Sequence, residues 1–307
     1  MNTTVDALDL ERLAEHLGDR FGTLESAEKF SGGQSNPTFR LVTSEGVFVL
    51  RRQPPGKLLK SAHAVDREFR VMAALRNTDV PVPRVLHLCE DRDVIGSMFY
   101  IMEFCDGRIF WDAAIPEVDR EQRTAIYDEM IRVLAALHSI DVDATGLADY
   151  GKPGNYFERQ YGRWSSQYRA SELQRIEPME QLITWLGGNI PADDGRVTLV
   201  HGDFRLDNMI FSGNEPRAIA LIDWELSTLG HPFADLADSE RDGGVTDAGA
   251  GVGARGVGEV GVEGPVIQQT VVQIAARTAA QSRSGMTALA ERARKGRSAA
   301  AWPRSFT

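Results

Sequence analysis

The sequence contains few cysteines and no long apolar run. Cys89 and Cys105 are its two cysteines; both lie in apolar contexts without metal-ligand spacing, which argues against a disulfide framework or a zinc site. No apolar run reaches the ~18 residues of a membrane span. The N-terminus also lacks the basic region and apolar core of a secretory signal. We therefore expect a soluble cytoplasmic protein with no membrane partner.

Positive charge is also scarce. The chain has 34 Lys and Arg residues against 44 Asp and Glu residues, which gives a formal net charge of −10. This balance argues against nucleic acid or an anionic membrane as the main partner. The chain has 307 residues, of which 42% are hydrophobic, enough to bury one large core or two modest lobes.

One stretch combines strand-like sequence with polar clusters. Two short apolar runs, 199–200 and 218–222, each end in such a cluster. Asp203 is followed five residues later by Asn208 and, after fifteen more, by Asp223. One aspartate can orient a hydroxyl nucleophile, while an amide oxygen and a second carboxylate suit a hard cation such as Mg²⁺. The stretch predicts phosphoryl transfer.

These motifs carry a family resemblance. His201-Gly202-Asp203, then Asn208, then Ile222-Asp223-Trp224 resemble the catalytic and metal-binding motifs of the aminoglycoside phosphotransferase family, which is similar in fold to the protein kinases. The resemblance implies that Asp203 is the catalytic base and that Asn208 and Asp223 bind Mg²⁺. Arg205 matches a phosphate-contacting position in the kinases, although it can equally pair with Asp207.

The resemblance also implies the architecture. We expect an α+β, two-lobed, protein-kinase-like fold, with a small antiparallel-sheet lobe over residues 1–105 that binds nucleotide and a mainly helical catalytic lobe over 106–237. Periodicity predicts strands at 46–52, 84–88 and 98–103 and helices at 5–17, 62–76, 119–139 and 171–186. The aromatic-rich segment 151–168 either lines an acceptor site or crosses the surface of the lobe.

Two segments of the first lobe are expected to bind the phosphates of ATP. Gly32, Gly33 and Ser35 form a glycine-rich turn that can cover phosphates, with an ordinary hairpin turn as the alternative. Strand alternation places Val49 and Arg51 on one face. The resemblance sets Val49 against adenine and puts Arg51 where the family has a phosphate-binding lysine. A solvated Arg51-Arg52 pair is the alternative.

Further positions complete the expected nucleotide site. Glu68, on the helix expected at 62–76, would pair with Arg51 as the family's helix glutamate pairs with its lysine, or would simply be a solvated residue. The backbone near Glu103 and Cys105, at the end of the strand expected at 98–103, would hydrogen-bond adenine. In addition, residues 31–41 and 50–71 most resemble the phosphotransferase domain associated with certain acyl-CoA dehydrogenases, which implies a hydroxyacyl-type substrate.

The composition changes after Ala237. Residues 238–307 hold eleven of the 29 glycines, with nine basic and seven acidic residues against 25 and 37 before them. This Gly/Ala-rich tail does not resemble the family's acceptor-binding helices. We expect it to be disordered or translated out of frame, which would leave the fold incomplete at the C-terminus.

The sequence therefore predicts an ATP- and Mg²⁺-dependent phosphotransferase that transfers the γ-phosphate to a hydroxyl group of a small molecule. Antibiotic, choline-like, sugar and hydroxyacyl acceptors stay open at this point, as do the choice between ATP and GTP and the oligomeric state. The alternative is a catalytically impaired nucleotide-binding pseudokinase or a truncated remnant, because loss of core helices can exceed the roughly 5–15 kcal/mol of stability that a domain has.

Overall fold

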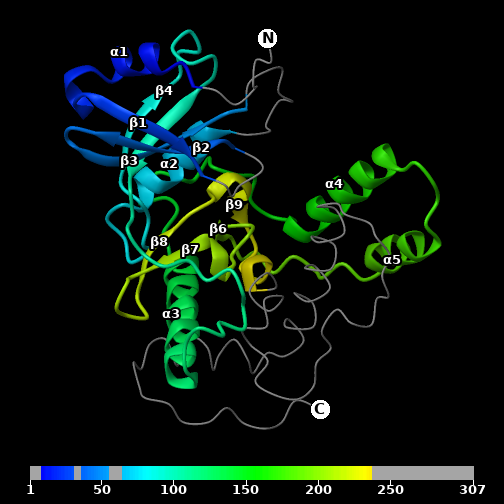
Figure 1. The fold of residues 1–307 in the computed structure, drawn as a ribbon. Helices are drawn as coiled ribbons and strands as arrows, with labels where there is room; N and C mark the ends of the chain where they lie inside the picture. The colour runs from blue at the N-terminus through cyan, green and yellow to red at the C-terminus, as the bar shows by residue number, and fades with distance from the viewer. Residues whose placement is uncertain (1–7, 31–35, 55–63, 237–307) are drawn as a thin grey trace.

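The first half of the chain is built around one antiparallel sheet (Figure 1). The computed structural model describes residues 8–30, 36–54 and 64–236. The sheet has five strands in the order β1-β2-β3-β5-β4, and each neighbouring pair is antiparallel. Its strands are β1 (Leu24–Lys29), β2 (Thr38–Thr43), β3 (Gly46–Arg52), β4 (Val85–Cys89) and β5 (Phe99–Glu103).

The two faces of this sheet have different neighbours. On β3, Leu50 is fully buried in a cluster with Leu13 and Leu17 of α1 (Leu10–Phe21). Val49 points the other way, into a larger cluster that includes residues of α2 (Val65–Leu75). The alternation predicted for residues 46–52 is therefore confirmed, and it puts α1 and α2 on opposite faces.

The chain leaves the sheet at Glu103 and immediately contacts the second half. The backbone N–H of Arg108 donates to the carbonyl of Phe211 at 2.7 Å, and the N–H of Phe211 donates back at 2.8 Å. Gly107 permits this approach, because a Cβ there would lie 2.3 Å from the carbonyl oxygen of Phe211. A lobe boundary near residue 105 fits this crossing and stays a prediction.

The second half is mainly helical, with two small hairpin-like sheets. Its helices are α3 (Arg120–His138), α4 (Tyr156–Ser171) and α5 (Glu177–Gly187). Strand β6 (Thr198–Val200) pairs with β9 (Thr228–Gly230), and β7 (Met209–Phe211) pairs with β8 (Ala218–Leu221). Short 3₁₀ turns, η1 (Leu206–Asn208) and η2 (Trp224–Leu226), follow β6 and β8 along the chain. Among the described residues, no helix is long and apolar enough to cross a bilayer.

Two predicted helices are wrong at their boundaries. The helix predicted at 171–186 begins later, because Ser171 is the last residue of α4 (Tyr156–Ser171) and α5 begins at Glu177 with Pro178 in its first turn. Proline is tolerated there because the first turn needs no N–H donor. The helix predicted at 5–17 begins at Leu10, where Asp9 caps it by accepting a hydrogen bond from the N–H of Arg12 at 3.1 Å.

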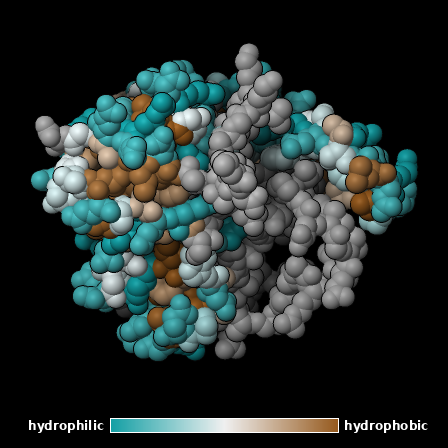
Figure 2. Space-filling view, turned by 45° about the horizontal axis from the view of Figure 1, so that its top comes forward, coloured by the Kyte–Doolittle hydropathy of each residue, from teal (hydrophilic) through white to brown (hydrophobic). Residues whose placement is uncertain are grey.

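Helices α4 and α5 extend to one side of the molecule. Figure 2 shows apolar surface at the outer end of this pair. Leu173, between the two helices, is fully exposed, and Trp185 of α5 is 46% exposed. A small separate cluster of Tyr168, Met179 and Ile183 holds the pair together. The expected tail, residues 238–307, lies outside the described residues.

Candidate phosphoryl-transfer site

Arg51 and Glu68 form a buried ion pair between the sheet and α2. The Nε atom of Arg51 lies 2.9 Å from Oε2 of Glu68, and the two side chains are 11% and 1% exposed. Glu68 faces inward because it shares a helix face with Val65 and Met72, which pack into the same core. Glu68 therefore pairs with Arg51 as predicted, and the solvated alternatives for both residues are wrong.

Two further donors hold the carboxylate of Glu68. The amide nitrogen of Asn36 donates to Oε1 at 2.8 Å, and the hydroxyl of Tyr100 donates to Oε2 at 3.0 Å. Burial raises the pKa of Glu68 to about 7, while the charge of Arg51 opposes that rise. Asn36, which follows the glycine-rich turn along the chain, therefore directs its amide at Glu68.

Arg51 also reaches the second half of the chain. Its Nη2 atom donates to Oδ1 of Asp223 at 2.5 Å and lies 3.7 Å from Oε2 of Glu225. Burial lowers the pKa of Arg51, but the surrounding carboxylates, led by Glu68, outweigh burial and raise it overall. One permanently charged guanidinium therefore links residues from β3, α2 and the segment after β8.

Asp223 stands in an unusual backbone conformation. Its φ and ψ are 65° and 55°, in the left-handed region, directly after Ile222 and before the η2 turn. Aspartate tolerates this region better than most residues, and such strain is concentrated at functional sites. The N–H of Ile222 donates to the carbonyl of Asn208 at 2.9 Å, which ties the two predicted metal-binding segments together.

Asp203 and Asn208 are joined within one loop. The amide nitrogen of Asn208 donates to the backbone carbonyl of Asp203 at 2.9 Å and to its Oδ2 at 3.0 Å. This orients the amide oxygen of Asn208 as the atom that can ligate a metal. Gly202 has a φ of +86°, and a Cβ there would lie 2.7 Å from the carbonyl oxygen of Leu226. The loop thus depends on glycine beside Asp203.

A buried carboxylate fixes the start of this loop. Asp235 has no exposed surface, and it accepts hydrogen bonds from the N–H groups of His201 at 2.9 Å and Gly202 at 2.8 Å. His138 lies 2.9 Å from the same carboxylate. The ring of His201 contacts the carbonyl of Ile222 at 2.9 Å, so this histidine braces the loop. Chain segments from α3, β6 and the C-terminal side of β9 converge here.

Arg205 forms an ion pair with its neighbour. Its Nε donates to Oδ1 of Asp207 at 3.0 Å, and its Nη2 contacts Oδ2 of the same carboxylate. Of the two interpretations drawn from the sequence, the structure shows the pairing with Asp207. A contact between Arg205 and phosphate stays a prediction.

The predicted adenine-binding residues Val49 and Glu103 lie on the neighbouring strands β3 and β5, and Cys105 follows β5. Val49 is 6% exposed and pairs in register with Met102 on β5. Glu103 ends β5; its N–H donates to the carbonyl of Arg84 at 2.9 Å, and its side chain accepts from the N–H of Arg84 at the same distance. Burial raises the pKa of Cys105 to about 11, so its thiol is neutral. Gly32, Gly33 and Ser35 lie outside the described residues.

Sequence reasoning missed several residues that complete the site. Glu225 and Tyr100 contact the Arg51–Glu68 pair, as described above. Arg67, one residue before Glu68, donates to the carbonyls of Tyr150 at 2.8 Å and Ser227 at 3.3 Å, and its guanidinium stacks 4.0 Å from the Tyr150 ring centroid. The alternation of β5 could have placed Tyr100 on this face. No local sequence pattern indicated that Glu225 and Arg67 belong to the site.

The chain is similar to known proteins along most of its length. The sequence profile of the phosphotransferase enzyme family matches residues 26–264. The chain belongs to this family. It is 48% identical over 237 residues to acyl-CoA dehydrogenase family member 10 of Mus musculus, an alignment that covers 76% of this chain. The chain spans 22% of the length of that relative.

Solved structures confirm the two-lobed, kinase-like fold. A candidate aminoglycoside phosphotransferase of Ralstonia eutropha JMP134 is 39% identical, with a TM-score of 0.69 over 94% of this chain and 95% of that one. The streptomycin–ATP ternary complex of APH(2")-IIa is 22% identical, with a TM-score of 0.56 over 75% of each chain. The predicted fold class and family resemblance are therefore confirmed.

Proposed function

We propose that this family member transfers the γ-phosphate of ATP to a hydroxyl group of a small molecule. The observation that carries the proposal is the position of Arg51. It contacts Glu68 at 2.9 Å and Asp223 at 2.5 Å, so a phosphate-binding cation and a metal-type carboxylate lie side by side. A solved neighbour binds ATP beside an aminoglycoside, which supports the choice of nucleotide and of a small-molecule acceptor.

The donor atoms present suit magnesium. The amide oxygen of Asn208 and the carboxylate of Asp223 are hard oxygen ligands, and the guanidinium against Asp223 indicates that positive charge is accommodated there. Mg²⁺ held by these residues would neutralise charge on the phosphates. Arg51 is a bidentate fork where the family has a lysine, so we expect it to bind phosphate oxygens with altered geometry.

Asp203 is the residue proposed to act on the acceptor. Its Oδ2 accepts a hydrogen bond from Asn208 at 3.0 Å, which holds the carboxylate in one orientation. In that position it would accept the proton of the attacking hydroxyl as the oxygen–phosphorus bond forms. Val49 would pack on adenine, and the backbone near Glu103 and Cys105 would hydrogen-bond its edge.

We propose a hydroxyacyl compound as the acceptor. Support comes from the subgroup resemblance of residues 31–41 and 50–71 and from the curated relatives, which are named acyl-CoA dehydrogenase family members. In this proposal phosphorylation would convert a hydroxyl into a better leaving group on the acyl chain. The larger relatives carry much additional sequence, so their own activities are not transferred to this chain.

The test is ATP turnover by the purified 307-residue chain with Mg²⁺ and a panel of hydroxyacyl, aminoglycoside, sugar and choline-like acceptors. We expect acceptor-dependent ADP release that Asp203→Asn reduces by at least about 100-fold. Asp149→Asn is the matched control, because Asp149 is exposed and, within the described residues, forms its ion pair with the exposed Arg70. Nucleotide binding without turnover on any acceptor would instead establish the impaired pseudokinase.

A further inference from the structure

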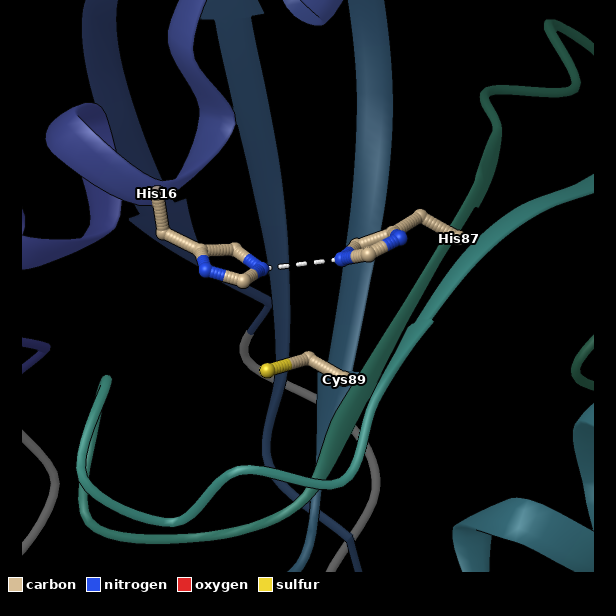
Figure 3. A group of neighbouring side chains, drawn as sticks. All are labelled: His16, His87 and Cys89. Carbon is tan, nitrogen blue, oxygen red and sulfur yellow. Dashed lines mark hydrogen bonds between the residues drawn. The ribbon is translucent and has the colours of Figure 1, made fainter.

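Three metal-binding side chains converge on the face of the sheet that carries α1 (Figure 3). His16 comes from α1, while His87 and Cys89 are two residues apart on β4 and therefore point to the same side. The Nε2 atoms of the two histidines lie 2.9 Å apart, and the three ligand atoms all lie within 4.8 Å of one another. His16 is exposed, whereas Cys89 is 3% exposed.

We propose that His16, His87 and Cys89 bind a transition-metal ion of the Zn²⁺ type. Tetrahedral zinc would place two nitrogens about 3.3 Å apart and a nitrogen and a sulfur about 3.6 Å apart. The observed distance between the two Nε2 atoms is 2.9 Å, and the sulfur of Cys89 lies within 4.8 Å of both histidine ligand atoms. Two imidazoles and a thiolate favour zinc and exclude Mg²⁺, which requires oxygen ligands. Three protein ligands leave one coordination position for water.

Some neighbouring contacts favour metal binding by these three residues, and others oppose it. The rings of His16 and His87 already face each other with their Nε2 atoms 2.9 Å apart, whereas the thiol of Cys89 donates to the carbonyl of Asp91 at 3.5 Å and must lose its proton to bind a metal. In addition, Nη1 of Arg20 lies 3.2 Å from Nδ1 of His87. Metal at Nε2 needs a proton on Nδ1, so the exposed Arg20 side chain must turn away. Removing that charge should therefore strengthen binding.

The site is separate from the phosphoryl-transfer residues. His87 pairs in register with Ile101, which is buried in the cluster beneath α1. Its neighbour Leu88 pairs with Tyr100, which faces Glu68 on the other side of the sheet. A bound metal would link α1 to the edge strand β4 without touching the nucleotide site. We infer a stabilising site for the first lobe, independent of the proposed catalysis.

Metal titration of the untagged full-length protein, stripped with a chelator and desalted, tests the proposal. Zn²⁺ affinity is measured by competition with a chromophoric chelator, and Co²⁺ serves as a spectroscopic probe. We expect one tight site with a thiolate-to-cobalt charge-transfer band. His16→Gln and Cys89→Ser should each weaken Zn²⁺ binding at least about tenfold. Arg20→Gln should strengthen it.

The controls distinguish this site from adventitious binding. Cys105→Ser removes the other cysteine, and we expect it to leave both the band and the affinity unchanged. His16 is exposed, so His16→Gln should fold, and it should abolish the rise in melting temperature that Zn²⁺ gives the parent. Cobalt bound without a charge-transfer band, or equal Zn²⁺ affinity in parent and Cys89→Ser proteins, would overturn the proposal.

Discussion

Two clusters hold the candidate site, one centred on the carboxylate of Asp235 and the other on the guanidinium of Arg51. Asp235 lies within the second half of the chain, is fully buried, and binds two backbone N–H groups of the loop that leads to Asp203. The Arg51 cluster joins residues far apart in the chain, and it consists of side-chain charges, namely Glu68, Asp223 and Glu225. The Asp235 cluster therefore fixes the backbone of a loop. In the Arg51 cluster, the guanidinium can exchange a carboxylate partner for a charged ligand.

This difference has an energetic basis. The backbone N–H groups of His201 and Gly202 donate to a fully buried carboxylate, so breaking these bonds leaves that carboxylate's buried oxygens to be desolvated without them. A guanidinium among several carboxylates keeps some partners when one is taken by a phosphate or a metal. The comparison indicates that the loop carrying Asp203 is rigid, whereas Arg51, to which we assign phosphate binding, can change its partners.

Removing the rigid cluster should have the largest effect. Asp235→Ala leaves the N–H groups of His201 and Gly202 buried and unpaired, so we expect the free energy of unfolding to fall by about 4 kcal/mol. Urea denaturation measures this, with the exposed Asp149→Asn as the control. A loss below about 1 kcal/mol would show that the loop does not depend on Asp235.

The Arg51 cluster should make the stability of the protein depend on pH, through Glu68. The pKa of Glu68 is about 7 in the folded protein, above its ordinary value of 4.5, so the folded state binds the proton more strongly. Stability from this group is present below pH 4.5 and is lost as the pH rises to 7, by up to about 3 kcal/mol.

Unfolding measured across that pH range should therefore differ between the parent protein and Glu68→Gln. The parent should lose stability relative to the variant as pH rises, because glutamine cannot ionise. Parallel pH profiles for the two proteins would mean that Arg51, Asn36 and Tyr100 hold Glu68 ionised throughout.

Substitutions of Arg51 test the role of this cluster in the proposed catalysis. Arg51→Met should lower kcat/KM for ATP about 100-fold, because the guanidinium that we propose to bind the phosphates is then missing. Arg51→Lys should stay within about tenfold of the parent, since lysine supplies the charge but not the fork. Equal losses in the two variants would indicate that the fork geometry matters more than the charge.

The smallest effect is expected from the glycine of the loop. Gly202→Ala places a Cβ 2.7 Å from the carbonyl oxygen of Leu226 at a φ of +86°, so we expect a loss of about 1–3 kcal/mol. Gly213→Ala is the matched control, because a Cβ there meets no atom within 4 Å. If both variants unfold at the same urea concentration, the loop has room to relax.

The fold was largely predictable because its signals are local. Alternation in residues 46–52 placed Val49 and Arg51 on one face, and helical spacing predicted α2, whereas the pairing of Glu68 with Arg51 came from the family resemblance. Helix boundaries were less predictable. The helical spacing at 171–186 did not indicate that the helix begins only at Glu177. Pro178 was the signal, because proline fits the first turn of a helix but interrupts a helix that has already begun.

The sequence by itself determined which functional groups are present: an aspartate, an asparagine and a second aspartate at kinase-like spacing, with an arginine in place of a lysine. Only the tertiary structure decided which groups meet. Arg51 contacts Asp223 across 172 positions, and His16 contacts His87 across 71. Periodicity reports which way a side chain faces within its own element. The packing of distant elements, which no local pattern encodes, determines what that side chain touches.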